Sequence, residues 1–161
     1  MAKAKPISDV NAEQPYAEAA ARIISVRSEE LAEHAQGVLD TGDIERVHDM
    51  RVATRRLRAA LEIFEPCFPP DAYVQTLAEV KRLADALGER RDRDVSIATL
   101  RAFNDQMPTP DRRGLGSLIE QLGKEQDEAN TALAPLVDGG HLKSLREALD
   151  ELVAGARGAA A

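Results

Sequence analysis

The residues best suited to chemistry in this sequence are one histidine and three arginines with regular spacing. His48, Arg51, Arg55 and Arg58 follow one another at steps of three, four and three residues. On a helix these steps place the four side chains within a sector of about 80°. Arginine carries a planar fork of donors that pairs with phosphate oxygens, and it keeps its charge at physiological pH. The spacing therefore predicts a basic face roughly 15 Å long that fits an extended polyanion.

Five further cations lie downstream around Gly88, and they are Lys81, Arg82, Arg90, Arg91 and Arg93. Asp92 and Asp94 accompany Arg91 and Arg93. Two roles remain open for these acids: they orient neighbouring guanidinium groups by hydrogen bonding, or Asp92 caps the start of a helix. Because glycine favours the left-handed turn that ends many helices, we expect a helix boundary at Gly88.

The distribution of charge matters more than the net charge of −7, which by itself argues against a phosphate-rich partner. Between residues 46 and 58 the chain carries five arginines and His48 against one acid, Asp49. Since salt confines the field of each exposed charge to about 10 Å, a basic patch on an acidic body can still attract an anion. A polyanion-binding protein is therefore compatible with the composition.

Length and composition place this basic face in one helical domain. The chain has 161 residues, which is enough to bury a core without a disulfide or a structural metal. Tryptophan is absent and aromatic residues make up 3%, whereas Ala, Leu, Glu and Arg are frequent, which favours helices. The sequence contains no run of about eighteen apolar residues, the length that would indicate a membrane span. The single cysteine, Cys67, has no partner in the chain, and we expect a cytoplasmic protein.

Prolines and glycines divide the chain into about six predicted helices, which span residues 15–36, 43–65, 71–87, 92–104, 110–136 and 141–153. We expect residues 1–14 to be disordered, residues 15–154 to form the helical domain and residues 155–161 to be a flexible tail. Apolar residues recur at helical spacing within the predicted helices, and the connections between them are short. The sequence therefore predicts an all-α fold, an antiparallel helical bundle.

Two segments resemble the CHAD family, the conserved histidine α-helical domain. The segment VHDMRVATRRLRAALEIF, residues 47–64, is similar to the family's His-x-x-Arg-x-x-x-Arg-x-x-Arg helix. The segment VKRLADALGERRDRDV, residues 80–95, is similar to its second signature through Lys81, Leu87-Gly88, Arg91-Asp92 and Asp94-Val95. Residues 113–153 resemble the remaining helices of the first half of the family's domain.

The resemblance implies a helical bundle whose basic residues bind inorganic polyphosphate. Carried over to this sequence, the implied polyphosphate-binding residues are His48, Arg51, Arg55, Arg58, Lys81 and Arg91, with Arg56 and Arg82 as further contacts. Asp92 and Asp94 match motif positions, and we expect them to support the ligands. Storage, targeting to polyphosphate granules and scaffolding for a polyphosphate-metabolising enzyme are the implied roles.

The chain departs from the family in one respect. The usual domain consists of two similar helical halves around a central basic channel, whereas this sequence contains only the first His/Arg helix. Two explanations stay open: the sequence belongs to a longer protein, or two copies form a homodimer that rebuilds the channel. We favour the homodimer.

Three other interpretations of the basic face remain open. An Arg-rich helix face is often only a solvated surface. His48 can also act as a histidine phosphoacceptor in a phosphorelay, although that chemistry does not require three arginines in a row. DNA or RNA shares the phosphate repeat, but the basic helix has no aromatic platform for bases.

We expect neither catalysis nor a resident metal. His34, His48 and His141 fall on different predicted helices and lack the spacing of a zinc site. Hydrolysis of phosphoanhydrides needs acids that hold metal ions, and Asp92 and Asp94 are the only acids at matching motif positions. We therefore expect a binding protein without a cofactor of its own, although divalent cations can accompany bound polyphosphate.

Overall fold

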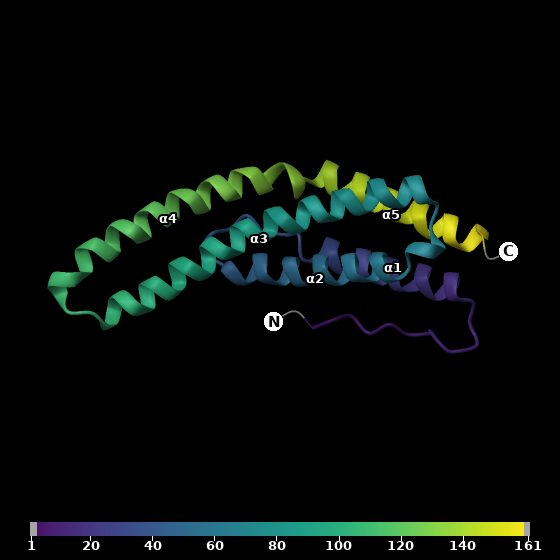
Figure 1. Cartoon of the computed structure of the whole chain (residues 1–161), viewed down its shortest axis with the longest axis horizontal. Helices are drawn as coiled ribbons and strands as arrows, with labels where there is room; N and C mark the ends of the chain where they lie inside the picture. Colours follow the sequence, from purple (N-terminus) through teal and green to yellow (C-terminus); the bar gives the residue numbers. More distant parts are fainter. Residues whose placement is uncertain (1–2, 160–161) are drawn as a thin grey trace.

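The computed structural model describes residues 3–159, and within this range the chain forms five α-helices and no strand (Figure 1). The α-helices are α1 (Tyr16–Glu33), α2 (Ile44–Ile63), α3 (Pro70–Gln106), α4 (Arg112–Leu133) and α5 (Gly139–Ala159). Short 3-10 turns η1 (Glu65–Cys67), η2 (Thr109–Asp111) and η3 (Ala134–Leu136) contribute to the connections. The predicted all-α fold is confirmed.

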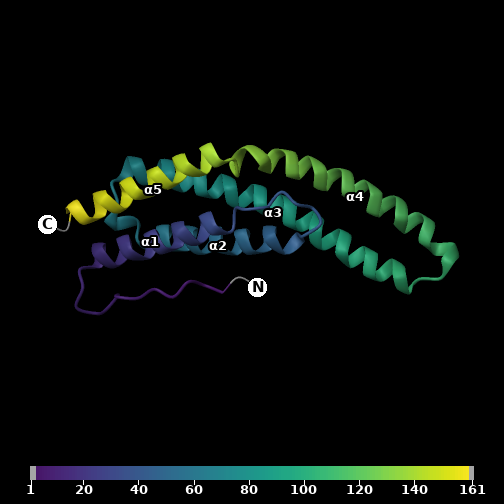
Figure 2. The same ribbon diagram turned by 180° about the vertical axis from the view of Figure 1, so that it is seen from behind.

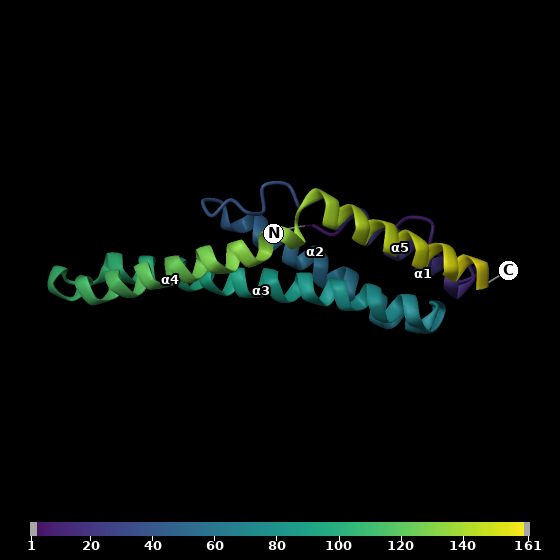
Figure 3. The same cartoon turned by 90° about the horizontal axis from the view of Figure 1, so that it is seen from above.

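The five helices form a bundle with a protruding arm. Helix α1 packs against α2 and α5, and α3 packs against α2, α4 and part of α5. Figures 1 and 2 show the first part of α3 lying with α1, α2 and α5, whereas its second part extends beyond them with α4. Figure 3 shows that α4 follows this outer part of α3 along its length. No described helix is both long and apolar enough to cross a membrane.

The core lies in the bundle and not in the arm. Buried apolar side chains come from α1, α2, α3 and α5, and the largest include Ile24, Leu57, Leu83 and Leu149. In contrast, Leu133 is the one buried residue of α4 within the described part of the chain. The amphipathic pattern of α4 therefore serves a two-helix contact with α3, which leaves Leu118 exposed and Leu115, Ile119 and Leu122 half-buried.

The expected helix boundary at Gly88 is wrong, because α3 runs without a break from Pro70 to Gln106. A glycine inside a helix costs about 1 kcal/mol relative to alanine. Buried residues on both sides of it, including Leu83, Leu87 and Ile97, fix α3 against its neighbours and outweigh that cost. The six predicted helices thus become five, and Asp92 lies inside a helix where it cannot act as an N-cap.

Both ends of the described chain carry contacts in the segments that we expected to be disordered or flexible. Residues 3–15 run back along α1 (Figure 1), where Lys5 forms ion pairs with Glu29 and Glu33. At the other end α5 continues to Ala159, and Ala156 is buried. Residues 160 and 161 of the expected tail lie outside the described part.

Candidate anion-binding groove

Three of the predicted arginines line one groove between α2 and α3. The groove has a volume of about 530 Å³. Its lining from α2 consists of Arg51, Arg55 and Arg58. Its lining from α3 consists of Ala84, Asp85, Gly88, Glu89 and Asp92. The structure therefore brings together the arginines of the predicted basic face on one side of a common space.

Two neighbouring sectors of α2 have different surroundings: one packs in the core and the other lines the groove. Met50, Leu57 and Leu61 are fully buried in the bundle. The arginines occupy the neighbouring sector of the helix, so their aliphatic stems can lie along the bundle while the charged ends reach solvent. On the facing helix Ala84 and Gly88 have little or no side chain, which leaves room between the two helices.

Arg51 and Arg55 make no direct contact with an acid in the described part of the chain. Within the described residues neither guanidinium forms an ion pair or a hydrogen bond. Arg51 is moreover half-buried, and no other half-buried or buried arginine in the described chain lacks such a partner. Neither charge is therefore neutralised by a direct contact from a described residue, and an anion in the groove could pair with both.

Arg58 and Lys81 meet at one end of the groove through a shared acid. The Nε of Arg58 donates to Glu62 at 3.0 Å, and the Nζ of Lys81 lies 3.6 Å from the same carboxylate oxygen. The hydrogen bond from Arg58, helped by the charges of Arg58 and Lys81, lowers the pKa of Glu62 below its ordinary value. Arg58, the last arginine of the row, and Lys81 beside it are therefore partly neutralised.

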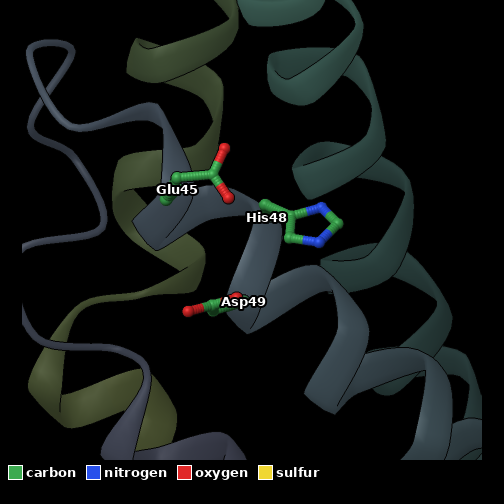
Figure 4. Close-up of side chains that lie close together, drawn as sticks. All are labelled: Glu45, His48 and Asp49. Atoms are coloured by element: carbon green, nitrogen blue, oxygen red, sulfur yellow. The ribbon is translucent and has the colours of Figure 1, made fainter. Parts of the chain in front are cut away.

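His48 lies one turn before Arg51, at the other end of the row, and its immediate neighbours are acidic. Figure 4 shows its imidazole pointing toward α3, whereas the side chain of Asp49 points away from it. Ligand atoms of Glu45, His48 and Asp49 lie within 4.8 Å of one another, so these groups could hold a cation. Glu45 is, however, also paired with Arg91 at 3.4 Å.

The other predicted cationic ligands point elsewhere. Arg91 donates to the backbone carbonyl of Ile44 at 2.8 Å and thus fastens α3 to the start of α2. Arg56 faces α1, where it donates to the buried carboxylate of Glu30 at 2.6 Å. Arg82 is exposed and is paired with Glu79 on its own helix. None of these three arginines is among the residues that line the groove.

The two predicted supporting acids have different surroundings. Asp92 is exposed and lines the groove. Asp94 is buried, and its Oδ1 accepts hydrogen bonds from Arg90 at 2.9 Å and from Gln126 at 2.5 Å. Arg90 is fully buried and also donates to Asn130, so the network ties α3 to α4. Asp94 therefore supports the arm and not the groove.

Sequence reasoning missed Asp85 and Glu89, which line the groove with Asp92. The sequence contained a signal for them, because Asp85, Glu89 and Asp92 follow one another at steps of four and three residues. Arg51, Arg55 and Arg58 on the facing helix have the same steps. The steps were hidden because the predicted boundary at Gly88 separated Asp85 from the other two acids.

Comparison with known proteins places this architecture in a family. The chain is similar to the crystal structure of the CHAD domain from the plant Ricinus communis, with a TM-score of 0.70 and 24% sequence identity. The match covers 96% of this chain and 52% of that one, so this chain spans about half the length of the plant domain. No curated protein sequence matches. The sequence profile of the CHAD domain matches residues 22–161, and the chain therefore belongs to the CHAD domain family.

Proposed function

We propose that this protein binds inorganic polyphosphate in the groove between α2 and α3, with Arg51 and Arg55 as its principal contacts. The observation that carries the proposal is the half-buried residue Arg51, whose guanidinium has no partner in the described chain and which lines a space of about 530 Å³. A bound phosphate would supply charge-assisted hydrogen bonds, each of which contributes about 1.5–3 kcal/mol. Membership of the CHAD domain family supports this ligand class.

The shape of the site favours an extended ligand. From Arg51 to Arg58 the row covers about 10 Å along α2 at 1.5 Å per residue. A single phosphate would meet one or two of these arginines, whereas a polymer would meet all three. His48 and Lys81 stand near the two ends of the row and would extend it for longer chains.

The groove is less suited to the two alternative functions. Its lining contains no aromatic side chain, so it offers no platform on which nucleic-acid bases could stack. A phosphoacceptor role needs only His48 and positive neighbours, and it leaves the row of Arg51, Arg55 and Arg58 unexplained. These observations favour polyphosphate over DNA, RNA and a phosphorelay.

In this proposal the protein is a binding module and not an enzyme. It would act in the cytoplasm by holding polyphosphate for storage or by recruiting partners, including polyphosphate-metabolising enzymes, to granules. A homodimer with two-fold symmetry would add a second arginine row to the first. Light scattering with and without polyphosphate measures the oligomeric state. A protein that binds polyphosphate with undiminished affinity as a monomer would contradict the homodimer.

Isothermal titration with phosphates of graded length tests the function. We expect orthophosphate to bind weakly and the affinity to rise with chain length until the row is filled. Competition with duplex and single-stranded DNA of equal phosphate content is the control for nonspecific attraction. Equal affinity for DNA and long-chain polyphosphate would contradict the proposal.

A further inference from the structure

The groove has walls of opposite charge. Three arginines, spaced four and three residues apart, line it from α2, and three acids with the same spacing line it from α3. The acids are Asp85, Glu89 and Asp92. A phosphate polymer that binds the arginines therefore lies against a row of carboxylates.

The two rows do not neutralise each other. Within the described residues no ion pair joins any of the three arginines to any of the three acids. Arg58 is paired with Glu62 on its own helix, and Glu89 with Arg93 on α3. Asp85 and Asp92 form no ion pair or hydrogen bond within the described range, so their charges face the groove uncompensated.

A bare polyphosphate chain, one without bound divalent cations, would be attracted by the arginines and repelled by these acids. The acids and the arginines line the same groove, so a chain bound to the arginines lies close to the negative charges of the acids. A cation between the phosphate oxygens and the carboxylates would reverse the sign of that interaction. Each wall would then contact the ligand favourably.

Mg²⁺ is chemically suited to that position. It prefers oxygen ligands and keeps several waters, and it is commonly held by one or two carboxylates together with substrate phosphates. The three groove acids do not form an all-protein metal cage, since the one group of three closely spaced metal-ligating residues in the described chain is Glu45, His48 and Asp49. A shared site is therefore the form of coordination that these acids can provide.

We propose that the groove binds polyphosphate as its complex with divalent cations, with Asp85, Glu89 and Asp92 holding the cations and Arg51, Arg55 and Arg58 holding the phosphates. This inference rests on the proposed function, and it assigns the carboxylates a role in the preference for metal-loaded polyphosphate. It predicts weaker binding of polyanions that carry fewer divalent cations.

The test is a titration of polyphosphate into the protein, in EDTA and in Mg²⁺ at constant ionic strength. If arginines alone determined binding, Mg²⁺ would weaken it by neutralising the ligand. We expect the opposite for the wild type, an affinity increase of about fivefold or more in Mg²⁺. The triple variant Asp85→Asn, Glu89→Gln and Asp92→Asn should bind bare polyphosphate more tightly than the wild type and lose affinity in Mg²⁺.

A matched control removes three exposed acids that do not line the groove, namely Asp105→Asn, Asp127→Asn and Asp150→Asn. It changes the net charge equally and should keep the Mg²⁺ response of the wild type. An affinity of the wild type that is unchanged or lowered by Mg²⁺ would overturn this inference and leave the proposed function intact. The absence of polyphosphate binding in both conditions would overturn the inference and the proposed function together.

Discussion

Gly88 on α3 lies opposite Arg51 on α2, and a Cβ placed on Gly88 would lie 4.0 Å from the Nε of that arginine. No atom of another described helix lies closer to this Cβ position. The glycine is thus not required by the backbone, because it lies in the interior of a continuous helix. It keeps the floor of the groove open beneath a guanidinium that has no partner within the described chain.

Substitutions at Gly88 should separate stability from binding. Gly88→Ala has room for its methyl group and should stabilise the protein by about 0.5–1 kcal/mol, since alanine is the better helix former. Its polyphosphate affinity should stay near that of the wild type. Gly88→Leu should keep the helix but fill the groove, and thereby weaken binding. Thermal denaturation and titration measure the two effects, and a Gly88→Leu variant with unchanged affinity would place the ligand elsewhere.

Glu62 should restrain binding by occupying Arg58 and Lys81. Glu62→Gln removes the counter-charge of both, and we expect polyphosphate affinity to rise about threefold, the equivalent of one weak exposed ion pair. The loss of stability should stay below about 1 kcal/mol because the side chains are exposed and screened. Unchanged affinity in isothermal titration would show that these two cations do not contact the ligand.

The same ion pair has a defined pH dependence. Because the pKa of Glu62 is lowered in the folded protein, its contribution to stability is present above the ordinary value of 4.5 and is lost as the pH falls through the lowered pKa. The difference in melting temperature between wild type and Glu62→Gln should therefore persist at neutral pH and vanish in acid. A difference that grew on acidification would contradict this assignment.

Two adjacent arginines on α2 should behave in opposite ways. Arg56→Ala leaves the buried carboxylate of Glu30 paired with Arg27, so we expect a loss of about 1–3 kcal/mol in stability and little change in affinity. Arg55→Ala makes the same change of charge in the groove and should weaken binding with little loss of stability. Chemical denaturation and titration of both variants check this, and a binding defect in Arg56→Ala alone would reverse the two roles.

The fold class and the principal basic residues were predictable from the sequence for physical reasons. The arginine steps of α2 fix a common sector on any helix, and the apolar spacing of Met50, Leu57 and Leu61 indicates which neighbouring sector is buried. The structure agrees on both points, since these three side chains are buried and the three arginines line one groove.

The features that the sequence alone could not resolve depend on contacts between helices. Gly88 carries a local signal for a helix end, but packing of Leu83 and Leu87 overrides it. Arg56 has the same local sequence character as Arg55, and only the position of Glu30 on α1 distinguishes them. The acids of the groove could not be assigned until α3 was known to be continuous and to face α2.

The central claim is that Arg51 and Arg55 together bind a phosphate polymer, and the salt dependence of polyphosphate affinity tests it most directly. The Arg51→Ala/Arg55→Ala variant is compared with Arg101→Ala/Arg146→Ala, which removes two exposed arginines outside the groove. We expect the groove variant to lose at least about tenfold in affinity and its log–log salt slope to fall by about two, because two fewer counterions are released. The control should keep the affinity and slope of the wild type. Equal slopes in all three proteins would contradict the account.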